Sequence, residues 1–104
     1  MFIVTVNHNC KADMIAQAID RIDGNGQAMA RVPGFLFRYR LRQTDDEKMI
    51  LTVTGWDEAT SYQRWLEIKK TMPDEGISPY VGATSAQHIV DSYVASHLNA
   101  RHNV

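Results

Sequence analysis

The sequence predicts an α+β plait with the element order β-α-β-β-α-β, in one domain over residues 1–104 whose core occupies residues 2–95. Three observations predict this fold. The stretch from Val32 to Leu66 has the pattern of a strand, a short polar turn, a second strand and a helix. A strand pattern and a helix pattern precede it, and a loop and a last strand follow it. A chain of 104 residues is long enough to bury one modest core.

Composition excludes several classes of partner. The net charge is −1, which gives no basic footprint for nucleic acid or for an anionic membrane surface. No apolar run approaches the ~20 residues of a transmembrane helix. The apolar start, residues 1–6, lacks the basic region of a signal peptide, and we predict a strand there. The single cysteine, Cys10, cannot form an internal disulfide, which is compatible with the reducing cytoplasm where we expect the protein.

The first strand is predicted over residues 2–9. Its side chains alternate, with Phe2, Val4 and Val6 on one face. The other face carries Ile3 and Asn7. Because both faces begin apolar, we expect this strand to be covered on both sides.

The first helix is predicted over residues 11–31. Ile15, Ile19 and Ile22 follow the spacing of a buried helical stripe. Two glycines in the segment 24–26 cost roughly 2 kcal/mol of helix propensity, and we expect one bent helix rather than two. Pro33 and Gly34 end it.

The second and third strands form an antiparallel hairpin around the polar turn 44–48. Residues 35–42 alternate between an apolar and a basic face. The apolar face consists of Phe35, Phe37, Tyr39 and Leu41. The basic stripe consists of Arg38, Arg40 and Arg42, and we expect it in solvent or in dimer salt bridges. The third strand covers residues 48–56.

The second helix follows with Asp57 as the expected N-cap and runs to about residue 70. Tyr62 and Leu66 mark its inner face, with Trp65 to one side. A loop over residues 73–84 follows, and loops of this length are usually functional or disordered. The last strand is predicted over residues 86–95, and a polar tail over residues 96–104.

This order of elements is that of the ferredoxin-like plait, an antiparallel sheet with both helices on one face. The other sheet face is left bare, although the strands carry apolar residues on both sides. An exposed apolar face marks an interface. We therefore expect a homodimer in which two sheets pack face to face.

Three short motifs resemble those of the antibiotic biosynthesis monooxygenase-like proteins, which have a dimeric α/β-barrel fold. They are Pro33-Gly34-Phe35 before the second strand, Trp56-Asp57-Glu58-Ala59 after the third, and Tyr62-x-x-Trp65-Leu66 in the helix. The resemblance covers residues 2–95. It implies one of two activities: cofactor-independent oxidation of phenolic polyketides or quinols, or haem degradation.

The haem-degrading branch of this family uses an Asn in the first strand, a Trp in the second helix and a later His as iron ligand. Asn7 and Trp65 stand at the first two positions, but Glu75 stands where the His belongs. No His occurs between residues 63 and 87, so the iron would lack its usual axial ligand. We predict a monooxygenase without cofactor. Haem degradation and a non-catalytic dimeric ligand-binding or stress-response protein remain alternatives.

The resemblance implies roles for particular residues. Asn7 would hydrogen-bond the substrate oxygen, with its face directed into the space between sheet and helices, and Trp65 would stack on the ring of a small aromatic ligand. His88 is the candidate base. For each of them, a purely structural role is the alternative.

Tyr62 and Trp56 are the further candidates for binding the substrate, against a role in the core. No His/Cys/Asp/Glu spacing matches a metal site, so no metal is expected. Cys10 precedes a helix start, which can lower the pKa of a thiol. His8 is next to Asn7 but points to the opposite face.

Overall fold

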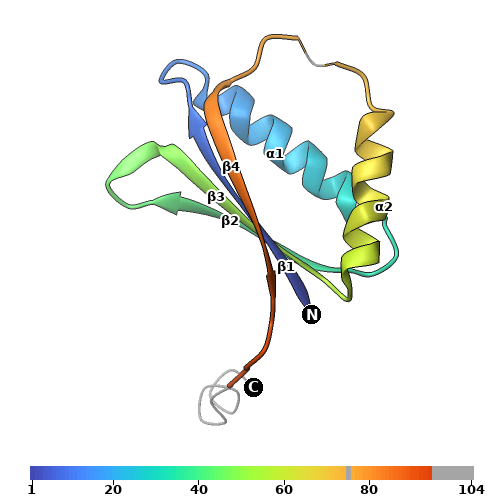
Figure 1. The fold of residues 1–104 in the computed structure, drawn as a ribbon. Coiled ribbons are helices and arrows are strands. Elements are labelled where there is room, and N and C mark those ends of the chain that lie inside the picture. Colours follow the sequence, from blue (N-terminus) through green and yellow to red (C-terminus); the bar gives the residue numbers. More distant parts are fainter. Residues whose placement is uncertain (75, 95–104) are drawn as a thin grey trace, which may run out of the picture.

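The computed structural model describes residues 1–74 and 76–94. The elements follow in the order β1 (Phe2–Cys10), α1 (Ile15–Met29), β2 (Phe35–Gln43), β3 (Asp46–Trp56), α2 (Ala59–Lys70) and β4 (Tyr80–Ile89). The strands form one antiparallel sheet in the order β2-β3-β1-β4, and both helices cover the same face of it (Figure 1). The predicted plait is confirmed. Neither helix is long and apolar enough to cross a membrane.

The last strand differs most from the prediction. It begins at Tyr80, inside the predicted loop, and ends at Ile89 rather than at residue 95. Pairing with β1 determines these limits, because β4 pairs along the whole of β1, from Phe2 opposite Ile89 to Cys10 opposite Tyr80. Gly82, which favoured a loop in the sequence, lies in the strand, and a Cβ atom there would have no neighbour within 4 Å. The predicted tail 96–104 lies outside the described residues.

Helix α1 is a single helix, as predicted, although it begins at Ile15 rather than at residue 11. Its buried residues are Ala18, Ile22 and Met29. Gly26 faces strand β2, where a Cβ atom would lie only 2.8 Å from Nη1 of Arg38. The glycine thus makes room for an arginine side chain under the helix.

Two clusters of buried side chains fill the space between helices and sheet. One contains Val4, Met29, Val32, Trp56 and Trp65, and the other contains Cys10, Ala18, Ile22 and Ile50. The two buried residues of α2 are Ser61 and Trp65, one helical turn apart. Trp65 was predicted to lie beside the inner face of α2, but it is 1% exposed and lies at the centre of that face.

Strand β2 turns its basic side to the helices and its aromatic side away from them. Phe35 pairs with Trp56 while Phe37 pairs with the neighbouring Gly55, so Leu36 is an extra residue in a β-bulge. The bulge places Phe35 in the core and Phe37 on the open face.

The predicted environment of the basic stripe is wrong for Arg38, which lies under helix α1, whereas Arg40 and Arg42 are exposed as predicted. Arg38 donates a hydrogen bond to the Ile22 carbonyl oxygen, and Arg40 donates to Asp23 Oδ1 over 2.6 Å. Tyr39 and Leu41, on the open face, are 59% and 45% exposed. The open face of the sheet is therefore rich in apolar side chains: Ile3, Phe37, Tyr39, Leu41, Leu51 and Val53.

Candidate functional site

A cavity of about 90 Å³ lies between the sheet and the two helices. Its apolar lining consists of Val4, Val6, Met29, Tyr62, Trp65 and Leu66. Its polar lining consists of His8, Asn25, Arg38, Thr52, Thr54 and Lys69. Every element except β4 contributes to it, so the cavity exists only once the two layers have packed. We call it the inner cavity.

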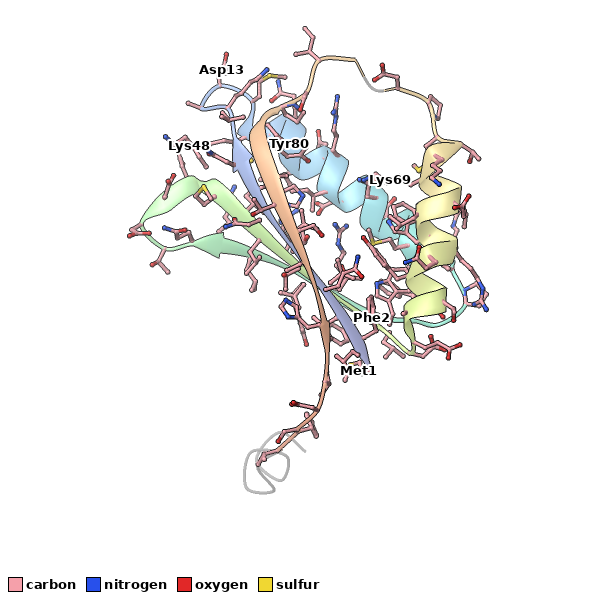
Figure 2. The ribbon with its side chains drawn as sticks, in the orientation of Figure 1. Met1, Phe2, Asp13, Lys48, Lys69 and Tyr80 are labelled. Atoms are coloured by element: carbon pink, nitrogen blue, oxygen red, sulfur yellow. The ribbon has the colours of Figure 1, made fainter. Side chains whose placement is uncertain are left out.

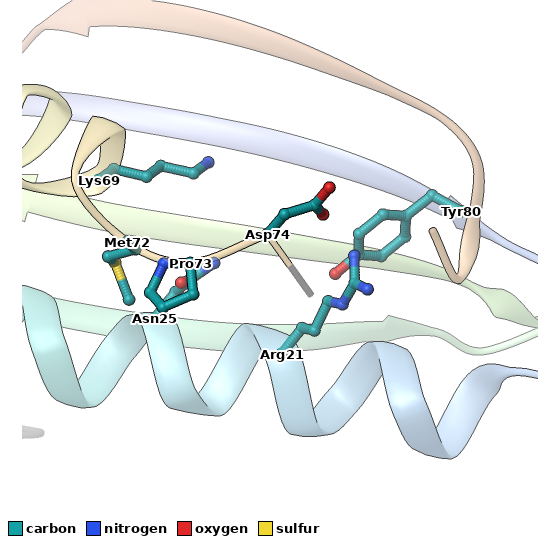
Figure 3. Close-up of a pocket in the computed structure, with 7 residues that line it drawn as sticks. All are labelled: Arg21, Asn25, Lys69, Met72, Pro73, Asp74 and Tyr80. Atoms are coloured by element: carbon teal, nitrogen blue, oxygen red, sulfur yellow. The ribbon is translucent and has the colours of Figure 1, made fainter. Parts of the chain in front are cut away.

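A second cavity of about 240 Å³, the outer cavity, adjoins the inner one and shares Asn25 and Lys69 with it. Figure 3 shows Lys69 reaching over it from α2, Arg21 rising from α1, and Tyr80 closing its far end from β4. Lys69 and Tyr80 both lie between the helices and the sheet (Figure 2). Together the two cavities reach the lower end of the range for small-molecule pockets, roughly 300 Å³.

His8 is the buried titratable group of the inner cavity. It is 9% exposed, and its Nδ1–H donates to the Ile50 carbonyl oxygen over 3.0 Å. A carbonyl only accepts, so this bond fixes the tautomer and leaves Nε2 as the proton-accepting nitrogen. Burial lowers the pKa of His8, and the charges of Arg38 and Lys69 lower it further, against the opposing effect of the Ile50 bond. His8 is therefore neutral at pH 7.

Arg38 and Lys69 bring two positive charges to the inner cavity. Nε of Arg38 is buried and has no hydrogen-bond partner among the described residues. Burial lowers the pKa of Arg38, and Asp23 partly offsets this effect. A buried N–H donor without a partner is costly, and a bound oxygen atom would satisfy it. The combination of apolar walls, two cations and a neutral imidazole suits an aromatic ligand with an acidic hydroxyl.

Of the residues predicted for the site, Trp65 and Tyr62 line the inner cavity. Burial raises the pKa of Tyr62, so its hydroxyl stays protonated near neutral pH. Trp56 is fully buried and contacts the rings of Phe35 and Tyr62, with centroids 5.5 and 5.9 Å apart. It lines neither the inner nor the outer cavity, and its Nε1 has no hydrogen-bond partner among the described residues.

Asn7 and His88 lie on the open face of the sheet. Asn7 is exposed and borders a hollow of about 200 Å³ with Leu41 and Leu51. His88 Nε2 lies 3.4 Å from the hydroxyl of Thr5, which is on the same face as Asn7. The prediction that the Asn7 face looks toward the helices is wrong, because Val4, Val6 and His8 occupy the helix-covered side.

Sequence reasoning missed the imidazole and the two cationic side chains of the inner cavity, which belong to His8, Arg38 and Lys69. One signal was available for His8, which follows Val4 and Val6 at the two-residue spacing of one strand face. A histidine that continues an apolar alternation belongs to the same face as the apolar residues. Arg38 gave no comparable signal, since its alternation with aromatic residues indicated an exposed position.

Two further observations concern the thiol of Cys10 and the possibility of a metal site. Cys10 is buried as a free thiol, and burial raises its pKa, contrary to the lowered value that a helix start suggested. Within residues 1–74 and 76–94, no group of three or more His, Cys, Asp or Glu side chains is arranged to hold a metal ion.

Comparison with known proteins points to one family. The family model described as antibiotic biosynthesis monooxygenase matches residues 1–69. No curated protein matches the chain. One similar solved structure is MhuD from Mycobacterium tuberculosis, a haem degrader with two haems bound in its active site. It superimposes with a TM-score of 0.69 at 23% sequence identity, and the match covers 89% of this chain and 99% of that chain. Another is SnoaB from Streptomyces nogalater, a cofactor-independent oxygenase. It superimposes with a TM-score of 0.69 at 16% sequence identity, and the match covers 91% of this chain and 98% of that chain. At these identities the two structures share the fold.

Proposed function

Because the chain belongs to the antibiotic biosynthesis monooxygenase family, we propose that it oxidises an electron-rich aromatic compound, such as a phenol, a quinol or a polyketide, with O₂ and without a cofactor. The observation that carries this proposal is the inner cavity, where Trp65 and Tyr62 form an aromatic wall opposite Arg38. Small-molecule sites typically combine apolar walls with a few polar groups that orient the ligand. SnoaB, a cofactor-independent oxygenase, has the same fold.

The proposed reaction takes all its electrons from the substrate. The phenol loses its hydroxyl proton, and the electron-rich anion reacts with O₂ at a ring carbon. One oxygen atom stays on that carbon as the carbonyl of a quinone, and the other leaves as water with the hydroxyl and ring hydrogens. The protein orients the ring, excludes water and stabilises the anion. Trp65 would stack on the ring, and Arg38 would face its oxygen.

The described residues give the haem alternative no better support than the reaction without a cofactor. The two cavities together are at the small end of the range for ligand pockets, whereas a porphyrin is a large ligand. The imidazole of the inner cavity, His8, lies on β1, whereas the haem-degrading branch has its iron ligand in the chain after the Trp of the second helix. Glu75, at the position of the expected iron ligand, lies outside the described residues.

The open sheet face supports a homodimer. Its apolar side chains include Tyr39 and Leu41, which a second copy of the sheet would bury. The hollow beside Asn7 would then lie at the interface. The free thiol of Cys10 is compatible with a reducing cytoplasm, where we place the protein.

Oxygen uptake tests the activity. A panel of phenols and quinols is added to haem-free protein in an oxygen electrode, with the quinone product measured by absorbance. We expect saturable uptake, with one quinone formed per O₂ consumed, and a lower rate for Trp65→Phe. Saturable binding of a panel member without uptake would instead support a non-catalytic ligand-binding protein. A saturable Soret shift on addition of hemin would favour the haem alternative.

Light scattering tests the dimer. We expect wild-type protein to have the mass of two chains. Tyr39→Lys places a charge on the apolar face, on the edge strand β2, and should give single chains. Glu47→Lys changes the charge of an exposed residue near the start of β3, beside the hairpin turn, and serves as the control. A wild-type monomer at micromolar concentration would rule out this interface.

A further inference from the structure

We propose that His8 is the base of the reaction: its Nε2 takes the hydroxyl proton of a phenol, and Arg38 and Lys69 hold the resulting anion. This inference rests on the proposed function and narrows its substrate to an aromatic compound whose acidic hydroxyl enters the inner cavity. It replaces His88, which lies on the other face of the sheet.

The geometry of His8 leaves it one role in proton transfer. Nδ1 is engaged with the Ile50 carbonyl, so its proton is held in place. Nε2 is the nitrogen that this bond leaves for another partner, and the His8 side chain lines the inner cavity. A ring fixed through one nitrogen, in a side chain that lines a ligand space, is an arrangement suited to a general base.

The other titratable groups near His8 are poor proton acceptors. Arg38 and Lys69 carry positive charge, and Tyr62 on α2 stays protonated because burial raises its pKa. Tyr80 on β4 packs its ring 5.1 Å from the His8 ring and directs its hydroxyl to the Ala18 carbonyl. Asp74, on the wall of the outer cavity, is exposed and does not line the inner cavity.

The proton balance closes within the site. The O–H bond of the phenol breaks and an N–H bond forms at Nε2, which turns two neutral groups into an anion and an imidazolium. Arg38 Nε then gains the oxygen partner that it lacks in the described residues. After O₂ has reacted, the imidazolium returns its proton to the departing oxygen atom, which leaves as water. Each turnover thus restores neutral His8.

The test uses 4-nitrophenol, whose anion is yellow and whose electron-poor ring resists oxidation, so that ionisation is observed without turnover. Absorbance at about pH 6 gives the fraction of bound probe that is ionised. Calorimetry in two buffers of different ionisation enthalpy gives the number of protons released. The variants are His8→Gln, whose amide can still donate to Ile50, and the matched control His88→Gln on the open face.

For the wild type and His88→Gln, we expect bound anion with almost no proton released, because His8 retains it. The two cations should lower the pKa of the bound probe by on the order of one unit, which corresponds to tenfold more anion. His8→Gln should release one proton for every anion formed. Arg38→Met should bind less anion but release no more protons per anion than the wild type.

Three results would overturn the inference: a full proton released by the wild type, an unchanged proton count in His8→Gln, or no binding of the probe to wild-type protein. Failure of the proposed function looks different. In that case the probe is ionised with the proton retained, but no phenol or quinol of the panel supports oxygen uptake.

Discussion

Replacing Arg38 by Met should leave the protein at least as stable as the wild type while weakening its affinity for anions. The guanidinium lies beneath helix α1, with Nη1 bonded to the Ile22 carbonyl and Nε without a partner among the described residues. Ile22 is inside α1, so its carbonyl keeps the helical N–H four residues on. Methionine is similar in length to the apolar part of arginine, so the substitution removes the charge and leaves no new unpaired group.

The magnitudes largely offset each other. A hydrogen bond from a charged donor contributes about 1.5–3 kcal/mol, and an unpaired buried donor costs about 1–3 kcal/mol. Replacement of a buried ionic group by an apolar one of similar volume is often neutral or stabilising by about 1–4 kcal/mol. We therefore expect the free energy of unfolding of Arg38→Met to rise by about 0–2 kcal/mol, or about 0–10 °C in melting temperature for a domain of this size.

Urea unfolding and the 4-nitrophenol assay measure the two effects on the same preparation. Arg40→Met is the control on the same strand, where the ion pair with Asp23 is partly exposed and contributes about 0.2–1 kcal/mol. It should lower stability slightly and leave the probe ionised. A loss of more than about 2 kcal/mol in Arg38→Met, with anion binding intact, would show that Arg38 is a structural residue rather than a ligand group.

Three other predictions concern single residues. The pKa of His8 is lower in the folded protein than in the unfolded chain. Neutral His8 therefore contributes fully to stability above pH 6.5, and this contribution is lost as the pH falls through the folded pKa. The urea midpoint should fall less on acidification in His8→Gln than in the wild type. Gly34 has φ +95°, and a Cβ there would lie 2.1 Å from Ser61 Oγ. Gly34→Ala should therefore lower the free energy of unfolding by about 2 kcal/mol or more, measured by urea unfolding. Gly82→Ala, where a Cβ meets open space, should lower it much less. Trp65→Phe should lower both the melting temperature and the affinity for aromatic ligands; a lower melting temperature with unchanged affinity would show that Trp65 belongs only to the core.

The sequence predicted the element order because apolar periodicity is local information. The isoleucine spacing of α1 and the alternation of β3 need no knowledge of partners. The limits of β4 depend on β1, which lies some seventy residues earlier and supplies the hydrogen bonds for residues 80–89. Local composition, with its proline and glycines, indicated a loop there instead.

The site was only partly predictable for a related reason. Alternation correctly placed Asn7 and His8 on opposite sides of β1, but it does not say which side the helices cover. Both faces of β1 begin apolar, so hydrophobicity did not decide between them. In β2 the bulge after Phe35 reversed the assignment, because Phe37 and the residues that follow changed faces without any change in the sequence alternation.

That bulge also bears on how this chain tolerates insertions and deletions. Leu36 has no pairing partner, is 52% exposed, and separates two correctly paired segments of β2. A gene that lost this codon would encode a regular strand in which Phe35 and Phe37 still lie on opposite faces. Loss of any codon from 38 to 41 would instead invert the faces of the residues on one side of the gap. Variation in length along β2 should therefore be accepted at position 36 and rejected at the positions that follow it.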